Sequence, residues 1–209
     1  ERSERGVLSE FGDSVRYVSE HRHVGLLIVV SFVVVMVGFP FVAFLPRLAT
    51  DVLEVGATGY GFLAATSAVG AVAMSVSIAG RSRGRVAWRI QSTTGLLFGV
   101  SLVLLALAPN YASALVAVAA VGATSSGFQA MNNSLVLALS DIEYHGRVQS
   151  LMMLSFGGFG MAALPLGVLA DAIGLRRMFT ITGMSVVVAM VVYRAASRRT
   201  VRRIGAADM

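Results

Sequence analysis

The stretch from Val24 to Gly84 decides the fold: VGLLIVVSFVVVMVGFPFVAFLPRLATDVLEVGATGYGFLAATSAVGAVAMSVSIAGRSRG. Its first apolar run, Val24–Leu45, carries no charge, and about 20 such residues suffice to cross a bilayer core of about 30 Å as a helix. A short polar turn is predicted next, marked by Arg47, Asp51 and Glu54. A second apolar run, Tyr60–Ala79, then returns across the bilayer and ends at an arginine cluster. This pair of apolar runs predicts a membrane protein, whose helices are surrounded mainly by lipid and not by water.

The same pattern repeats along the chain. Six apolar runs are predicted to span the membrane: Val24–Leu45, Tyr60–Ala79, Ile90–Ala108, Ala112–Leu139, Val148–Ala170 and Met178–Ala196. The chain is 56% hydrophobic and only 13% charged, whereas soluble domains carry about 25% charged residues. The predicted fold class is therefore an all-α membrane protein with six transmembrane helices. Pro40 lacks a backbone N–H and is expected to kink the first run.

Polar segments flank these runs, so three parts are predicted. Residues 1–23 form a cytoplasmic linker that reads either as a short amphipathic surface helix or as a partly disordered segment. Residues 24–196 form the transmembrane domain, and residues 197–209 form a basic tail. Because the chain begins at Glu1 and not at Met, we expect it to be a fragment of a longer protein.

Arginine placement predicts the orientation. All 17 basic residues are arginines, and fourteen of them fall on the side that holds both termini. Short cytoplasmic loops are enriched in basic residues, so both termini are predicted to be cytoplasmic. Arg47, Arg176 and Arg177 are the exceptions, and Asp171 lies near the last two in sequence. The net charge of +6 is thus assigned to the membrane surface and not to nucleic acid, which makes the bilayer the expected partner.

A faint internal repeat suggests how the helices are organised. The second run ends in a small residue followed by Arg81, then Gly84 and an arginine, and the fifth run ends in a small residue followed by Asp171, then Gly174 and an arginine. The two ends are predicted to lie on opposite sides of the membrane. An inverted repeat of three helices plus three gives this arrangement.

The distribution of reactive residues argues against an enzyme. The chain has no cysteine, and His21, His23 and His145 all lie at polar ends. Ser125 and Ser126 therefore have no histidine base at membrane depth, which a serine protease needs. Clustered histidines and carboxylates for a metal are also lacking, so neither a metal nor a cofactor is expected. No span carries an ionisable residue in its middle, which argues against a proton relay within this segment.

The fourth run has the richest set of polar residues: Thr124, Ser125, Ser126, Gln129, Asn132 and Asn133. One reading is a substrate-facing patch, and the other is hydrogen bonding between helices. Glycines and alanines are dense in the second and fifth runs, at Gly61, Gly70 and Gly160 among others. These small residues are expected to permit close approach of helix backbones.

Three segments together resemble a known family. GFPFVAFLPRLATDVLEVGATGYGFLAATSAVGAV is similar to the seventh and eighth helices of major facilitator superfamily transporters, in the branch of enterobactin exporters and macrolide-efflux permeases. NNSLVLALSDIEYHGRVQSL, with its Gly146-Arg147-Val148 step, resembles that branch's connection between the tenth and eleventh helices. GVLADAIGLRR resembles the end of the eleventh helix. The resemblance covers nearly the whole chain but only the C-terminal half of such a transporter.

The resemblance implies an exporter of apolar or amphipathic small molecules, of antiporter type, in the inner membrane, whose N-terminal six-helix half is missing from this chain. The first, second, fourth and fifth runs would line the cavity, which makes the candidate substrate contacts Phe39, Gln129, Asn133, Phe156 and Phe159. The family's cytoplasmic loop often reads Asp-Arg-x-Gly-Arg; here Gly84 and Arg85 keep its end, but Arg81 replaces the aspartate. This departure and the lack of charge at membrane depth leave an alternative open, a non-transporting six-span scaffold or a degenerate permease half.

Overall fold

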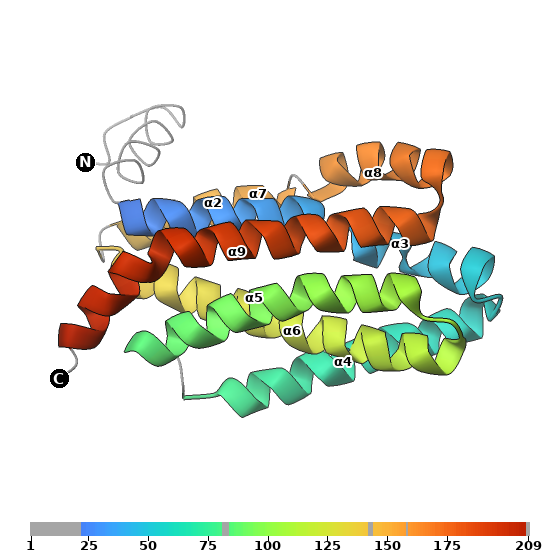
Figure 1. Ribbon diagram of the computed structural model, residues 1–209, viewed down its shortest axis with the longest axis horizontal. Coiled ribbons are helices and arrows are strands. Elements are labelled where there is room, and N and C mark those ends of the chain that lie inside the picture. The colour runs from blue at the N-terminus through green and yellow to red at the C-terminus, as the bar shows by residue number, and fades with distance from the viewer. Residues whose placement is uncertain (1–21, 81–83, 142–143, 158, 208–209) are drawn as a thin grey trace, which may run out of the picture.

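Helices make up almost all of the described chain. The computed structural model describes residues 22–80, 84–141, 144–157 and 159–207 (Figure 1). In chain order the elements are α2 (Arg22–Val37), α3 (Phe41–Arg47), the π-helical turn η1 (Leu48–Val52), α4 (Gly56–Ile78), α5 (Gly84–Leu107), α6 (Tyr111–Leu139), α7 (His145–Gly157), α8 (Phe159–Ile173) and α9 (Leu175–Ala207). These residues contain no strand, so the all-α prediction is confirmed for them.

Five stretches of the described residues are long and apolar enough to cross a membrane as one helix. They are Gly25–Val52, Gly56–Ile78, Gly84–Leu107, Tyr111–Leu139 and Leu175–Ser197, and they cover the predicted runs one to four and six. The predicted fifth run is covered instead by the shorter helices α7 and α8, and residue 158 between them lies outside the described residues. A sixth single spanning helix is therefore not confirmed.

The first span is interrupted at Pro40, as predicted. α2 ends at Val37, a turn follows, and α3 begins at Phe41. Proline offers no N–H to continue the helical ladder. The N–H groups of Phe41, Val42 and Ala43 donate instead to carbonyls three residues earlier, at 3.3, 3.2 and 2.9 Å. The turn places the intervening Phe39 at a break in the helix.

The polar turn predicted directly after Leu45 is wrong, because helical structure continues to Val52. Two local interactions let polar residues join this extension. Arg47 pairs with Asp51 one turn later at 3.4 Å, and the Thr50 hydroxyl donates to the Pro46 carbonyl at 3.2 Å. The chain turns only after η1, where Glu54 has a φ of +55°.

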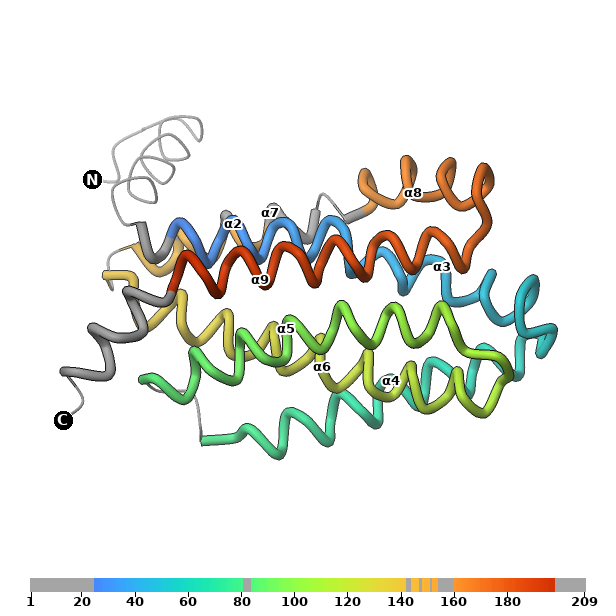
Figure 2. The backbone as a smooth tube through the Cα atoms, viewed as in Figure 1, coloured from blue at the N-terminus to red at the C-terminus, as the bar shows by residue number. Residues whose placement is uncertain are grey.

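The helices pack around α6. α4 and α5 both lie against α6, α5 also lies along α9, and α2 contacts α9, α7 and α6 (Figure 2). α2 and α5 begin, and α9 ends, at one end of the bundle (Figure 1). We call it the arginine-rich end, after Arg85, Arg89 and Arg194. The opposite end carries Arg47 and Arg176.

Glycines allow α4 and α6 to touch through their backbones. A Cβ at Gly122 of α6 would overlap the Ser67 carbonyl of α4, and one at Gly70 of α4 would overlap the Ala119 carbonyl of α6. The predicted close approach is thus confirmed for Gly70. Gly61 and Gly160 make no such approach within the described part of the chain, because a Cβ at either position would have no neighbour there within 4 Å.

Arg176 caps the end of α5. Its Nη1 donates to the carbonyls of Ala106 and Ala108 at 2.9 and 2.7 Å. The last carbonyls of a helix lack partners within it and carry partial negative charge, so a guanidinium there is favourable. Asp171, near Arg176 in sequence, pairs with Arg47 at 2.8 Å. Two of the three exceptional arginines therefore have local partners.

The flanking segments are described only in part. Residues 1–21, which include most of the predicted amphipathic linker, lie outside the described residues. α9 runs from Leu175 to Ala207, so the predicted basic tail begins inside a helix that continues from the last span.

Candidate functional site

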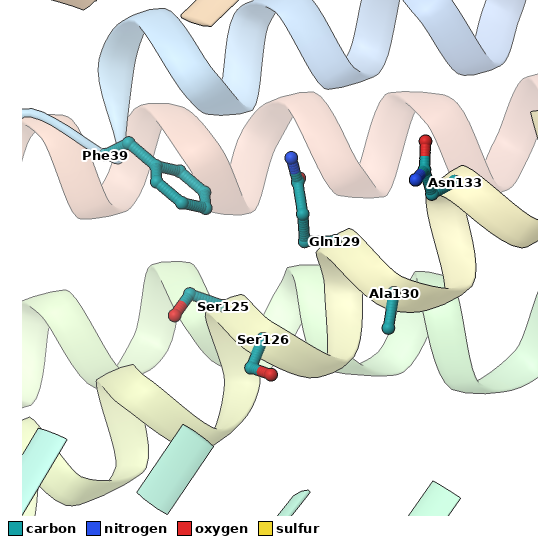
Figure 3. Close-up of a pocket in the computed structure, with 6 residues that line it drawn as sticks. All are labelled: Phe39, Ser125, Ser126, Gln129, Ala130 and Asn133. Carbon is teal, nitrogen blue, oxygen red and sulfur yellow. The ribbon is translucent and has the colours of Figure 1, made fainter. Parts of the chain in front are cut away.

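A cavity of about 380 Å³ opens beside the middle of α6. We call it the α6 cavity. It is lined by Phe39, Ser125, Ser126, Gln129, Ala130 and Asn133 (Figure 3). Five of these residues come from two turns of one helix, because residues four apart share a helix face.

Local structure fixes both walls of the cavity. α6 starts at Tyr111 because the Asn110 side chain accepts from the Ser113 N–H at 2.9 Å and caps the helix. Phe39 sits in the turn before Pro40, and its ring packs against Phe98 with centroids 5.5 Å apart. Gln129 and Asn133 project from α6 toward the segment that carries Phe39 (Figure 3).

The cavity offers neutral hydrogen-bonding groups. The hydroxyl of Ser125 donates to the Gly122 carbonyl at 3.1 Å, and that of Ser126 bonds the Ser75 hydroxyl of α4 at 2.9 Å. Gln129 Oε1 is buried and has no hydrogen-bond partner in the described part of the chain. None of the six lining residues is charged. An aromatic wall facing free amide groups suits a ligand with an apolar body and a few polar atoms.

A comparison with protein families now bears on the whole chain. Residues 3–209 match the family described as transmembrane secretion effector, which is a family of major facilitator superfamily (MFS) transporters. The chain belongs to this family. A comparison with curated proteins gives no match. Apolar helices and family membership together make it a multi-pass membrane protein.

The structure brings together three of the five candidate contacts of this MFS chain. Phe39, Gln129 and Asn133 line the same cavity. Phe156 lies in α7 and Phe159 begins α8, but their side chains lie outside the described part of the structure. The other lining residues, Ser125, Ser126 and Ala130, were not candidate contacts. Ser125 and Ser126 belong to the polar set of the fourth run, and Ala130 directly follows Gln129.

The polar residues of α6 divide between two roles. Asn132 is fully buried and accepts from Gln91 Nε2 of α5 at 3.2 Å. The Thr124 hydroxyl returns to its own helix at the Ala120 carbonyl, 2.6 Å away. Hydrogen bonding between helices is thus the role of Asn132 and Ser126, whereas Gln129 and Asn133 face the cavity.

The predicted loop-motif residues lie at the arginine-rich end. Gly84 begins α5 with a φ of +56°, a value that glycine adopts without strain. Arg85 follows it and is exposed, and Gly146 is exposed in the first turn of α7. Arg81 and the side chain of Arg147 lie outside the described residues.

The described residues contain no group of three or more His, Asp or Glu side chains placed to hold a metal ion. The chemistry visible at the α6 cavity is therefore that of neutral amides, hydroxyls and an aromatic ring. Such groups can bind a small molecule by hydrogen bonds and apolar contact.

Proposed function

We propose that this chain is the C-terminal six-helix half of an MFS exporter that moves apolar or amphipathic small molecules outward by alternating access. The observation that carries the proposal is the α6 cavity, where Phe39 faces the amides of Gln129 and Asn133. Family membership makes the chain a transporter-type protein. The direction of transport and the class of substrate go beyond family membership and are part of the proposal.

Reciprocal packing between α5 and α9 supports an inverted repeat of three helices plus three. A Cβ at Gly99 would lie 2.7 Å from the Gly183 carbonyl, and a Cβ at Gly183 would lie 2.7 Å from the Gly99 carbonyl. Each glycine also meets the valine four residues after the other, Val187 and Val103. An exchange of equivalent contacts between antiparallel helices is what a two-fold axis in the membrane plane produces.

The hydroxyls beside these glycines follow the same symmetry. Ser101 and Ser185 each lie two residues after the glycine, and each donates to the carbonyl four residues earlier at 2.8 Å. α5 and α9 are the third and sixth helices if α7 and α8 together make the fifth crossing. The inverted repeat pairs these two helices, so their matching motifs fit it.

The arrangement of arginines supports cytoplasmic termini in the inner membrane. Arg85, Arg89 and Arg194 share one end of the bundle with the start of α2. At the opposite end, Arg47 and Arg176 are held by a carboxylate and by helix carbonyls. The positive-inside rule assigns the end with more arginines to the cytoplasm.

Efflux by the full-length protein tests the proposal. Gln129→Leu with Asn133→Leu keeps the size of each side chain roughly constant but removes the amides from the cavity. We expect substrate efflux from cells to fall strongly while the protein level stays unchanged. Val116→Leu is the matched control, because Val116 lies on the same helix and is 74% exposed away from the cavity. Unchanged efflux in the double variant would contradict the role given to the α6 cavity. No substrate efflux by the natural protein would favour the alternative of a non-transporting scaffold or degenerate permease half.

Labelling of single cysteines tests the orientation, since the natural chain has no cysteine. Ala57 and Asn110 are exposed at the end opposite the arginine-rich end, and Asp141 is exposed between α6 and α7. An impermeant maleimide added to intact cells should label Cys at position 57 or 110 and should not label Cys at position 141. The reverse pattern would contradict the proposed topology. Sequencing upstream of Glu1 is expected to reveal six further apolar runs.

A further inference from the structure

Three polar side chains from three helices come together inside the bundle. Gln91 comes from α5, Asn132 from α6 and Tyr193 from α9. Their exposed fractions are 0%, 0% and 3%. Trp88 closes one side, because its ring stacks on that of Tyr193 with centroids 6.1 Å apart and planes 10° apart. We call these three residues the buried polar cluster.

Only one hydrogen bond is made within the buried polar cluster. Gln91 Nε2 donates to Asn132 Oδ1 at 3.2 Å. Gln91 Oε1, Asn132 Nδ2 and the Tyr193 hydroxyl have no partner among the described residues. The hydroxyl lies close to the Gln91 side chain but does not meet the geometry of a hydrogen bond. The cluster therefore holds one unused acceptor, one unused donor and one group that can be either.

Exchanging the oxygen and nitrogen of the side-chain amides does not give the unpaired groups a hydrogen-bond partner. Turning both side-chain amides over exchanges donor and acceptor in the bond between Gln91 and Asn132, and it again leaves one acceptor and one donor without partners. Turning only one places two donors or two acceptors against each other. The unused groups follow from the residue types and their positions and not from the choice of rotamer.

We propose that the buried polar cluster binds one water molecule. Lipid offers no hydrogen bonds to compensate these groups, so leaving them unpaired in a membrane interior is costly. A single water can donate to Gln91 Oε1, accept from Asn132 Nδ2 and bond the Tyr193 hydroxyl. Three hydrogen bonds are the usual number for a buried water.

The donor set favours water over a cation. A bound Na⁺ or Ca²⁺ would need several oxygen ligands, and carboxylates are the usual ones. The buried polar cluster contains no carboxylate, and its amide N–H groups would point toward the ion. Water, which donates and accepts together, matches the mixture of unused groups.

The bound water would join the three helices next to the face of α6 that lines the cavity. Asn132 and Asn133 are neighbours that point about 100° apart around the helix axis, so Asn132 bonds Gln91 of α5 while Asn133 lines the α6 cavity. A water that ties Asn132 to α5 and α9 fixes the rotation of α6, and hence the direction in which Gln129 and Asn133 project. The water site itself does not depend on the proposed transport function.

X-ray radiolytic footprinting of the protein in lipid nanodiscs tests the site. A bound water exposed to X-rays releases hydroxyl radicals, which oxidise the side chain next to it, whereas a dry buried side chain stays unmodified. We expect Tyr193 to be oxidised several-fold faster than Phe98, each rate normalised to that of the free amino acid. Phe98 is the internal control because it is fully buried and belongs to the apolar core of the bundle. Equal rates for the two residues would overturn the proposal.

A variant identifies the source of the label. Gln91→Leu with Asn132→Leu removes the unused donor and acceptor together, and it should lower Tyr193 oxidation to the rate of Phe98. If Tyr193 stays as reactive in this folded double variant, bulk solvent supplies the radicals and the proposed site is wrong. If the double variant fails to fold, a high-resolution structure of the natural protein decides, by density for a water or by a direct bond from Tyr193 to Gln91.

Discussion

α4 and α5 pack against the same helix, α6, and are almost the same length and similarly apolar, yet they have different surroundings. Only 17% of the most apolar stretch of α4 is buried, against 56% of that of α5. α4 leaves Phe62, Val69 and Val76 exposed. α5 buries Phe98 and also Gln91, which is polar. The length of an apolar run therefore indicates that a helix can cross a bilayer. It does not indicate whether the sides of that helix contact lipid or protein.

The difference lies in how each helix is attached. α4 packs on α6 from one side, where Gly70 and Gly122 let the backbones meet. Hydrogen bonds from the Tyr111 hydroxyl to the Gly59 carbonyl and between Ser75 and Ser126 add to this contact. α5 is held along its whole length, by the buried polar cluster near its start, by Gly99 in its middle and by Arg176 at its end. α4 therefore depends mainly on its contact with α6, whereas α5 is held by both α6 and α9.

The largest effect is expected at the contact between α4 and α6. Gly122→Ala places a methyl group on the Ser67 carbonyl, and overpacking of this kind costs about 3 kcal/mol. Thermal unfolding in nanodiscs should show a clear loss of stability. Gly61→Ala on α4 is the matched control, since its Cβ enters open space, and it should gain about 0.5 kcal/mol from helix propensity. Similar losses for both variants would contradict a specific backbone contact between Gly122 and Ser67.

A smaller and symmetric effect is expected between α5 and α9. Gly99→Ala and Gly183→Ala each bring a Cβ to 2.7 Å from the opposite carbonyl, so each should lose about 2 kcal/mol of stability. The double variant should lose less than the sum, because the two changes separate the same pair of backbones. Clearly unequal single losses would argue against the proposed two-fold relation between α5 and α9.

Removal of the α5 cap is expected to cost less. Arg176→Gln loses the charge beside the carbonyls of Ala106 and Ala108, which is worth about 1 kcal/mol at a helix end. Arg177→Gln changes the neighbouring, exposed arginine and should leave the unfolding temperature unchanged. If both variants behaved alike, the cap would not stabilise α5.

The smallest effect is expected on the open face of α4. Val72 is 63% exposed, and Val72→Ala should change the stability of this chain by no more than about 0.5 kcal/mol. The same unfolding measurement on the full-length protein gives a second comparison. Under the proposal that this chain is half of a transporter, a clear loss in the full-length protein but not in this chain alone would mean that this face of α4 contacts the other half.

Much of the fold followed from local sequence. Four of the six predicted runs correspond to single helices, and the first corresponds to α2, α3 and η1, with its break at Pro40 where the missing N–H required one. The polar extension from Arg47 to Asp51 was missed, because its helical state depends on a salt bridge and on a back-bonding threonine. The candidate contacts that line the cavity, Phe39, Gln129 and Asn133, came from the family resemblance. The spacing showed only that Gln129 and Asn133 share a helix face.

The sequence alone determined that the chain enters a bilayer, roughly where its helices run, and which family it resembles. Those properties depend on the length of apolar runs and on arginine placement, because lipid leaves the backbone no choice but internal hydrogen bonds. Only the tertiary structure decided that Asn132 bonds Gln91 while Asn133 faces the cavity, that Arg176 caps α5, and that α4 stays largely uncovered. Those outcomes depend on which helix lies next to each side chain, and the neighbours come from distant parts of the chain.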